Sequence, residues 1–393
     1  MADEIELDFG IFRVMPEWKT QLHGDRIPEG GSMRIDVAGR RVMTEVVQVD
    51  PERPSQEDIA RAAECLRRGG LVAFPTETVY GLGVHALDRA ALRRLFESKG
   101  RPTNDPLIVH VAALDRVAPL VVDPPEHAAP LAARFWPGPL TLVMRRAPAV
   151  PLEVTAGLES VAVRVPAHPV ARALLLAASL PVAAPSANLF SRPSPTRASH
   201  VLDDLNGRID MVVDGGPTQM GVESTVLDLT VDPPAVLRPG AISVEMLRTV
   251  VPSVRLATVR VVPDGAEPAA SPGLLILHYA PRAPVMLYQG EPAAVRRAWI
   301  GAAHKAEAAG MRVGVLATTE DVPLLTGVPV VIAELGSEHD VDAIAARLYA
   351  ALRDLDAAQV DMILARDVSR VDGLWRAVRD RLHRAAKRVT VID

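Results

Sequence analysis

Short apolar runs of strand length alternate with segments of helical spacing along most of this 393-residue chain. Ser55 can cap a helix, and Ile59, Ala63 and Leu66 recur after it on one helical face. The apolar run 71–74 then follows as a buried strand. Repeated strand and helix segments of this kind predict an α/β fold with a mixed, mostly buried sheet and flanking helices.

Spacing and capping residues place further elements along the chain. Helices are expected at 88–100, 127–135, 169–178, 293–308 and 341–354. Strands are expected at 107–111, 140–145, 161–165, 181–184, 209–213, 225–229, 285–288, 312–316 and 361–364.

Four regions follow from this pattern. Residues 1–43 mix charges and glycines without periodicity, which predicts an N-terminal extension of weak order. Residues 44–258 form the larger α/β domain, and 259–283 have the proline- and glycine-rich composition of a linker. Residues 284–393 alternate as a smaller doubly wound domain, without a dinucleotide-binding or Walker A glycine motif.

Composition narrows the function classes. No run of about 18 apolar residues suggests a membrane span, and the acidic start lacks a secretory pattern. A single cysteine, Cys65, excludes an internal disulfide and a cysteine-based zinc site, and a cytoplasmic location is expected. The net charge of −5 argues against nucleic acid bound over the whole surface, but it permits a local basic cleft.

Three polar stretches are expected to form one anion-binding cleft. The first, 74–83, reads as a strand that leads into a glycine-containing binding turn. The second, 99–102, carries Lys99 and Arg101 just after a helix, and the third, 185–188, supplies a hydroxyl and an amide. Taken singly, the second could be a solvated helix end and the third an ordinary polar turn.

Lys99 stands out because arginine supplies nearly all of the positive charge. Only four of the 43 basic residues are lysines, and Lys99 is the only lysine between positions 20 and 304. A compact ammonium is not interchangeable with a planar guanidinium, so Lys99 is a candidate functional residue, with chance as the alternative. No Ser/His/Asp triad or covalent nucleophile is evident. The residues suit electrostatic clamping and positioning, as in nucleotidyl transfer.

Ten short motifs together carry a family resemblance. They are PTETVYGLG at 75–83, KGRP at 99–102, PLIVHV at 106–111, WPGPLTLV at 136–143, VAVRVP at 161–166, APSAN at 184–188, DGGP at 214–217, GVEST at 221–225, LRPG at 237–240 and HYAP at 278–281. The chain resembles the Sua5/YrdC/YciO family in its two-domain Sua5 form, strongly over 44–258 and more loosely over 284–393.

The resemblance implies a fold and a reaction. The fold is a YrdC-like twisted mixed sheet with a concave cleft, plus a smaller Rossmann-like C-terminal domain. The reaction is L-threonylcarbamoyladenylate synthesis, in which ATP, L-threonine and bicarbonate give threonylcarbamoyl-AMP and pyrophosphate. Mg²⁺ accompanies ATP. A downstream transferase complex then makes N6-threonylcarbamoyladenosine at position 37 of tRNAs that read ANN codons.

The resemblance also assigns roles to residues of this chain. Those implied in catalysis, by charge neutralisation or support of the nucleotide loop, are Lys99, Arg101, Ser186 and Asn188. Those implied to bind threonine are Thr78, His110, Arg145, Ala184 and Ser224. Those implied to contact ATP are Arg101, Asp105, Thr141, Ser186, Ser194, Arg238 and Tyr279. No residue is expected to ligate a metal directly.

Two departures and two rival functions remain. Asp105 stands where the family often has asparagine, and an acid beside ATP is unfavourable. Residues 274–277 of the linker are all apolar, whereas the family typically carries a lysine, a tyrosine and an arginine in the last three of these positions. The rivals are a non-catalytic module that binds tRNA or double-stranded RNA, and a relative that uses carbamoyl-adenylate. The modest basic content argues against the first. The lack of the cysteine-rich zinc segments found in hydrogenase-maturation proteins argues against the second.

Overall fold

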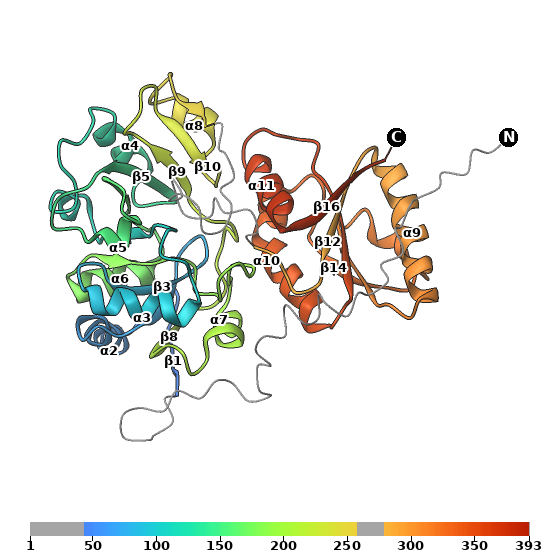
Figure 1. Cartoon of the computed structure of the whole chain (residues 1–393), viewed down its shortest axis with the longest axis horizontal. Helices are drawn as coiled ribbons and strands as arrows, with labels where there is room; N and C mark the ends of the chain where they lie inside the picture. Colours follow the sequence, from blue (N-terminus) through green and yellow to red (C-terminus); the bar gives the residue numbers. More distant parts are fainter. Residues whose placement is uncertain (1–42, 258–278, 393) are drawn as a thin grey trace.

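The computed structural model describes residues 43–257 and 279–392. Its strands form an eleven-stranded mixed sheet in the first range and a five-stranded parallel sheet in the second (Figure 1). This confirms the predicted α/β fold with a large mixed sheet and a smaller parallel one. The predicted extension over 1–43 lies almost wholly outside the described residues, and so do residues 259–278 of the predicted linker over 259–283.

The larger sheet runs in the order β1-β8-β2-β3-β7-β4-β6-β5-β9-β10-β11. Its strands are β1 Glu45–Gln48, β2 Val72–Pro75, β3 Tyr80–His85, β4 Ile108–His110, β5 Leu140–Arg145, β6 Ser160–Arg164, β7 Val182–Ala183, β8 Met211–Asp214, β9 Thr225–Asp228, β10 Ala235–Arg238 and β11 Arg255–Leu256. Its helices are α2 Gln56–Arg67, α3 Arg89–Lys99, α4 Ala128–Phe135, α5 Leu152–Thr155, α6 Pro169–Ala178, α7 Ala198–Leu205 and α8 Val244–Arg248.

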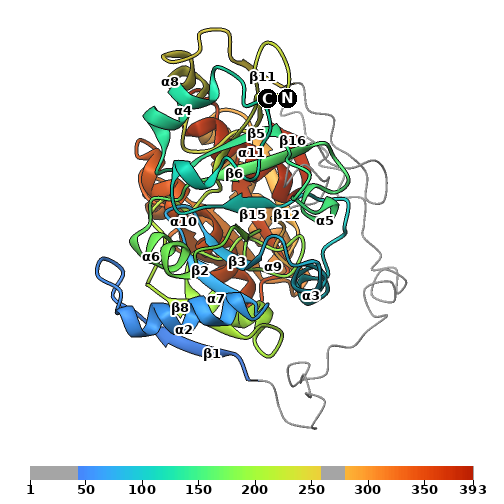
Figure 2. The same cartoon turned by 90° about the vertical axis from the view of Figure 1, so that its left-hand side faces the viewer.

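Both faces of this sheet are covered by helices (Figure 2). In β2, Val72 and Phe74 pack with α2 and α6, whereas Ala73 packs with α3 and α7 on the opposite face. Alternate side chains of a strand point to opposite faces, so a strand covered on both sides needs an unbroken apolar run. This explains why 71–74 is recognisable as a buried strand.

The stretch 75–83 differs from its prediction. Strand β2 does lead into a turn, but the turn spans 76–79 and joins β2 to β3 in a hairpin. Gly81 and Gly83 lie within β3, so they do not form the turn beneath a ligand. A Cβ atom on Gly83 would approach Phe74 Cε1 and Val182 Cγ1 to 2.8 Å, so glycine is required there by close packing between strands.

The smaller sheet runs in the order β14-β13-β15-β12-β16 and all its pairs are parallel. Its strands are β12 Val285–Gln289, β13 Val313–Ala317, β14 Val330–Glu334, β15 Met362–Arg366 and β16 Ala386–Val391. Its helices are α9 Pro292–Ala308, α10 Val341–Ala357 and α11 Trp375–Ala385. Helix α9 covers one face, and α10 and α11 cover the face toward the larger sheet (Figure 1).

The contact between the two sheets is built by α10 and α11. Val79 and Val222 of the larger region join the apolar cluster formed by these helices. Gly221 lies so close beneath α10 that a Cβ atom there would be 2.3 Å from the carbonyl oxygen of Ala345. The C-terminal helices therefore rest directly on the segment that carries the GVEST motif.

Candidate functional site

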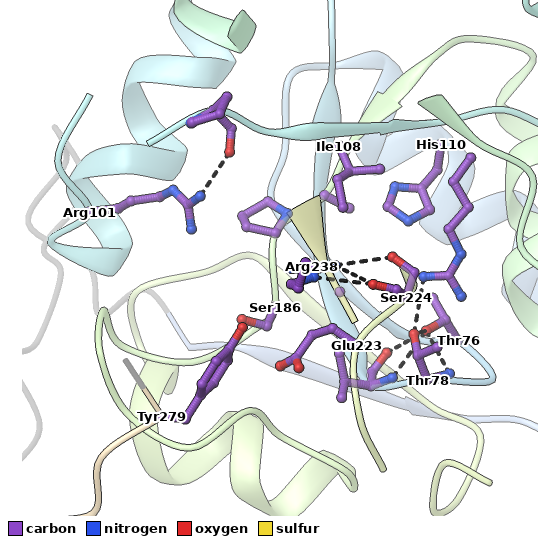
Figure 3. Close-up of a pocket in the computed structure, with 16 residues that line it drawn as sticks. Thr76, Thr78, Arg101, Ile108, His110, Ser186, Glu223, Ser224, Arg238 and Tyr279 are labelled. Carbon is purple, nitrogen blue, oxygen red and sulfur yellow. Dashed lines mark hydrogen bonds between the residues drawn. The ribbon is translucent and has the colours of Figure 1, made fainter. Parts of the chain in front are cut away.

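A small pocket opens between the β2–β3 hairpin, β4, β10 and the first described residue after the linker segment, Tyr279 (Figure 3). Its lining includes the following predicted site residues: Thr78, Arg101, His110, Ala184, Ser186, Ser224, Arg238 and Tyr279. It also includes residues that the motifs did not single out, among them Thr76, Arg164 and Glu223. The three polar stretches thus each contribute residues to one pocket, as predicted, because the strands and loops that carry them meet although they are distant in sequence.

One corner of the pocket is made by the hairpin turn. The Thr76 hydroxyl donates to the Val79 carbonyl at 2.6 Å and accepts the Thr78 amide at 3.2 Å, which fixes the turn. Arg164 Nη1 donates to Thr78 Oγ1 at 3.1 Å, and Arg164 Nη2 lies 2.7 Å from Glu77 Oε1. Arg164 and Glu77 are both buried, so this ion pair holds the Thr78 hydroxyl at the pocket wall.

His110 faces this corner from β4. Burial, aided by the nearby Arg164 charge, lowers the pKa of His110 to about 3, so its imidazole is neutral at physiological pH. Its Nδ1 atom has no hydrogen-bond partner within the described residues. A neutral imidazole can offer one donor and one acceptor, which suits a small polar ligand rather than an anion.

Ser224 links the corner to the cationic side of the pocket. Its hydroxyl lies 2.8 Å from Thr141 Oγ1 and accepts from Arg238 Nη2 at 3.1 Å. Arg238 also donates to the Ser224 carbonyl through Nε and Nη2 at 3.1 and 3.0 Å. Thr141 is fully buried behind the wall and does not line the pocket, so its direct contact is with Ser224.

Arg101 provides a second guanidinium, and Asp105 explains the sequence departure. Arg101 Nη2 lies 2.9 Å from Asp105 Oδ2 and donates to the Pro106 carbonyl at 2.9 Å. Asp105 is completely buried and does not line the pocket. The acid therefore fixes the direction of Arg101 rather than facing a ligand, and its negative charge is compensated within the pair.

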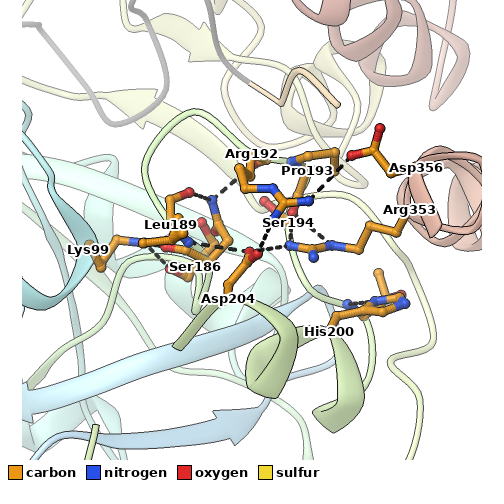
Figure 4. A network of polar contacts seen from close by, with 12 residues as sticks. Lys99, Ser186, Leu189, Arg192, Pro193, Ser194, His200, Asp204, Arg353 and Asp356 are labelled. Carbon is orange, nitrogen blue, oxygen red and sulfur yellow. Dashed lines mark hydrogen bonds and ion pairs between the residues drawn. The ribbon is translucent and has the colours of Figure 1, made fainter. Parts of the chain in front are cut away.

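Lys99 lies behind the pocket wall (Figure 4). Its ammonium donates to the carbonyls of Ser186, at 2.6 Å, and of Asn188. Burial, together with the Arg101 charge, lowers the pKa of Lys99 well below its usual range. Asn188 in turn donates to the carbonyls of Leu189 and Arg192. The expectation that Lys99 meets phosphate or carboxylate directly is not met here, because its donors are used to shape the 186–188 loop.

Arg145 also lies elsewhere than predicted. Its side chain is 69% exposed and Nη1 lies 3.4 Å from Asp123 Oδ2, away from the lining residues. The pocket's buried guanidinium beside Thr78 is that of Arg164. Arg145 shares a strand face with Thr141, four residues earlier in β5, but it lies at the exposed end of the strand.

Glu223 is another lining residue that was not predicted, although it lies in the quoted GVEST motif. Its carboxylate accepts from Ser194 Oγ at 2.5 Å, from Arg381 Nε at 2.8 Å and from the Tyr349 hydroxyl at 2.9 Å. Burial alone would raise the pKa of Glu223, but the charges of Arg381 and Arg238 outweigh burial and bring it to about 2. Predicted residue Ser194 thus contacts Glu223 rather than the pocket space.

Two of these partners come from the C-terminal helices. Tyr349 lies in α10 and Arg381 in α11, and Tyr279 packs against both, with ring centroids of Tyr279 and Tyr349 5.4 Å apart. Arg353 of α10 donates to the Pro193 carbonyl at 2.5 Å and lies 2.7 Å from Asp204 (Figure 4). The smaller domain therefore supports both the Glu223 wall and the loop that carries Ser186.

The fold and the pocket together define the class of protein. It is an α/β protein with two sheets, in which helices of the smaller, parallel sheet complete the wall of a polar, arginine-lined pocket in the larger domain. The sequence matches the family described as "Telomere recombination" over residues 64–240 and the family "Threonylcarbamoyl-AMP synthase, C-terminal domain" over residues 242–387. The chain belongs to the Sua5 family of threonylcarbamoyl-AMP synthases.

Individual relatives agree over nearly the full length. A threonylcarbamoyl-AMP synthase of Pyrococcus abyssi is 44% identical over 88% of this chain and 98% of its own. One from Bacillus subtilis is 44% identical over 84% of this chain and 92% of its own. The crystal structure of Pyrococcus abyssi Sua5 complexed with L-threonine matches with a TM-score of 0.81 at 42% identity, covering 89% of this chain and 100% of that chain.

Within 43–257 and 279–392, no three His, Cys, Asp or Glu side chains are grouped so that they could hold a metal ion. Among the same residues, no helix is long and apolar enough to cross a membrane.

Proposed function

We propose that this protein is an L-threonylcarbamoyladenylate synthase, which joins threonine, bicarbonate and ATP in the pocket of Figure 3. The observation that carries the proposal is the division of one small pocket into two chemical halves. A corner of small hydroxyl, methyl and imidazole groups, in which the Arg164 charge is compensated by Glu77, lies directly beside the guanidiniums of Arg101 and Arg238. The first half suits threonine and the second suits a polyphosphate.

Threonine is proposed to occupy the corner of hydroxyl, methyl and imidazole groups. The Thr78 and Ser224 hydroxyls and the His110 imidazole can hydrogen-bond its hydroxyl and amino groups, while Ala184 contacts its methyl group. A site that hydrogen-bonds the substrate hydroxyl rejects analogues that lack it, because its buried polar groups would be left unpaired. Arg164 or a reoriented Arg145 would neutralise the substrate carboxylate.

ATP is proposed to lie on the cationic side. Arg101 and Arg238 would neutralise the phosphates, and Ser186 and Tyr279 would border the nucleotide. Glu223, which lines the pocket, and Glu77, which lies next to it, are already ion-paired with arginines. Mg²⁺ would therefore enter on the ATP phosphates with water as its remaining ligands, which is its usual mode with nucleotides.

The proposed chemistry needs no covalent enzyme intermediate. The threonine amine and bicarbonate give N-carboxythreonine with loss of water. Its carboxylate oxygen forms a bond to the α-phosphorus of ATP, and the bond from that phosphorus to the bridging oxygen breaks, which releases pyrophosphate. Arg101 and Arg238 are oriented before substrate arrives, so they can stabilise the charge that develops at phosphorus without reorganisation.

Residues behind the wall are proposed to position those that touch substrate. Lys99 and Asn188 shape the loop that presents Ser186, and Asp105 directs Arg101. Thr141 and Ser194 act in the same way, on Ser224 and Glu223. The product would pass to a transferase complex that modifies adenosine 37 of ANN-decoding tRNAs.

The decisive experiment incubates the full chain with MgATP, L-threonine and bicarbonate and measures pyrophosphate and threonylcarbamoyl-AMP. Pyrophosphate release is expected to require both threonine and bicarbonate. Release without threonine, or none from a protein that is folded, would overturn the proposal. Tight tRNA binding without pyrophosphate release would favour the RNA-binding rival. Turnover with carbamoyl phosphate in place of threonine and bicarbonate would favour the carbamoyl-adenylate rival.

A further inference from the structure

Gly81 lines the pocket of Figure 3, and the fold does not explain why this residue is a glycine. It lies in β3, and its φ is outside the left-handed region that favours glycine. A Cβ atom at this position would be 3.4 Å from Ala184 Cβ and 3.8 Å from both Phe74 Cζ and the Pro185 carbonyl oxygen. These are ordinary van der Waals distances, so neither the backbone nor the packing of the protein requires glycine here.

Gly83, two positions further along the same strand, shows the opposite case. A Cβ atom there would approach Phe74 and Val182 to 2.8 Å, so these side chains would have to move. Gly83 does not line the pocket. Packing between strands therefore explains Gly83, whereas Gly81 is explained only by the space in front of it.

The segment that carries Ser186 fixes the direction in which a side chain at position 81 would point. Gly81 and Ser186 are directly opposed in an antiparallel bridge. The Leu82 amide donates to the Pro185 carbonyl at 2.8 Å beside this pair. Side chains of an opposed pair stand on the same face, with Cβ atoms about 4.5–5.5 Å apart. Because Ser186 lines the pocket, a side chain at position 81 would enter the pocket from the same wall.

Such a side chain would lie nearer to the corner proposed for threonine than to the nucleotide side. Its Cβ atom would be 3.4 Å from Ala184 Cβ, whereas the opposed Ser186 Cβ is about 4.5 Å away or more. Ala184 is the residue proposed to contact the methyl group of threonine. A methyl carbon in contact with Ala184 needs a position about 3.5–4.0 Å from its Cβ. A side chain on Gly81 would take up that space, which we call the notch.

We propose that Gly81 is a specificity-determining residue, whose missing side chain leaves the notch that admits the methyl group of threonine. The inference rests on the proposed function for the identity of the ligand. Thr78 and Ser224 can hydrogen-bond the substrate hydroxyl, but serine carries the same hydroxyl. The notch supplies the discrimination that those hydrogen bonds cannot, because serine leaves it empty.

Gly81→Ala tests the notch directly. Calorimetric titration of the full chain with L-threonine and with L-serine gives one ratio of affinities, and pyrophosphate release gives the matching ratio of kcat/KM values. The parent is expected to favour threonine. Both ratios should fall about tenfold or more in Gly81→Ala, since one methyl group in a fitted apolar site is worth about that much. The KM for ATP should stay near the parent value. The melting temperature should not fall, because alanine at a compatible φ restricts the unfolded chain.

Gly83→Ala is the matched control on the same strand. It should lower the melting temperature and leave the ratio of threonine to serine affinity unchanged, because its Cβ meets only Phe74 and Val182 at the closest distance. An unchanged ratio in Gly81→Ala would overturn the inference, as would a loss confined to ATP, or a fall in melting temperature as large as that of the control.

The two readouts separate this inference from the proposed function. The expected change in affinity ratio without pyrophosphate release would support the notch and reject the proposed reaction. Pyrophosphate release that depends on threonine, with an unchanged ratio in Gly81→Ala, would reject the notch and support the reaction. A folded parent that binds neither amino acid would overturn both.

Discussion

The ion pair between Glu223 and Arg381 joins the C-terminal helix α11 to the wall of the pocket. Removing one partner measures how much this pair contributes to the free energy of unfolding. Arg381→Met keeps an unbranched side chain of similar reach but leaves a buried carboxylate supported only by neutral donors and by the field of Arg238. The pKa of Glu223 is lowered from 4.5 to about 2, which at 1.4 kcal/mol per unit corresponds to about 3 kcal/mol. Breaking one side of a buried pair generally costs about 3–5 kcal/mol.

The assay is thermal unfolding followed by circular dichroism. A loss of about 3 kcal/mol should lower the melting temperature of Arg381→Met by about 5–10 °C. Arg376→Met on the same helix is the matched control, because its partner Glu245 is 3.6 Å away and half exposed, so the change should be small. The double variant Glu223→Gln/Arg381→Met removes the unpaired charge and should recover at least half of the loss.

The pH dependence gives an independent check on the same pair. Because the folded pKa of Glu223 is lowered, its carboxylate stabilises the parent fully above about pH 4.5, and this contribution is lost as the pH falls toward 2. In Arg381→Met the carboxyl is buried without its cation, so its pKa should rise and the stability deficit should shrink on acidification. A melting temperature within 1 °C of the parent, or no recovery in the double variant, would refute the reasoning.

Four further predictions follow from the contacts. Gly221→Ala should lower both melting temperature and pyrophosphate release, because its φ is +69° and the added Cβ would meet the Ala345 carbonyl at 2.3 Å; Gly216→Ala, with φ of +78° and open space, isolates the backbone strain and should leave activity near the parent. Lys99→Met should reduce kcat with loss of order in the 186–188 loop by hydrogen exchange, and parent-like activity would remove Lys99 from the site. Because the pKa of His110 is lowered to about 3, its neutral form should cause no inflection in kcat/KM near pH 6.5, and its contribution to stability should fall as the pH drops from about 6.5 toward 3; an inflection that His110→Gln removes would contradict this. Arg145→Ala should raise the KM for threonine about tenfold or more only if the side chain turns into the pocket, and an unchanged KM would leave Arg164 as the carboxylate partner.

The sequence predicted the ends of helices best where a single capping residue fixes the local backbone. Asp88 accepts the amides of Ala90 and Ala91 at the start of α3, and Gly100 ends that helix with φ of +62°, so both ends were predictable. Strand β16 was not predicted, because its mostly exposed residues lack the continuous apolar run of a strand covered on both faces. Strand β14 was not predicted either, although its first four residues do form such a run. The short strand β1 was not predicted, since its register depends on pairing with distant β8.

The residues of the candidate site were likewise predicted only in part. Arg101, Ser186, Ser224 and Arg238 were predicted from their motifs, and they line the pocket. The motif residues that lie behind the wall could not be told from these, since a motif records which residues are present but not which way each side chain faces. Asp105 appeared as a doubtful ATP contact in sequence, and the structure gives it Arg101 as a partner.

Sequence alone determined the α/β class, the family resemblance and the convergence of three polar stretches, because capping, periodicity and motif residues act over a few positions along the chain. Tertiary structure alone decided that Lys99 faces backbone carbonyls, that Arg145 points to Asp123, and that Glu223 is held by Tyr349 and Arg381. The two contacts of Glu223 join residues more than 100 positions apart. The contacts of Lys99 and Arg145 span 22 to 89 positions. Side-chain direction and burial at such separations depend on how the two sheets pack, and no local pattern encodes that packing.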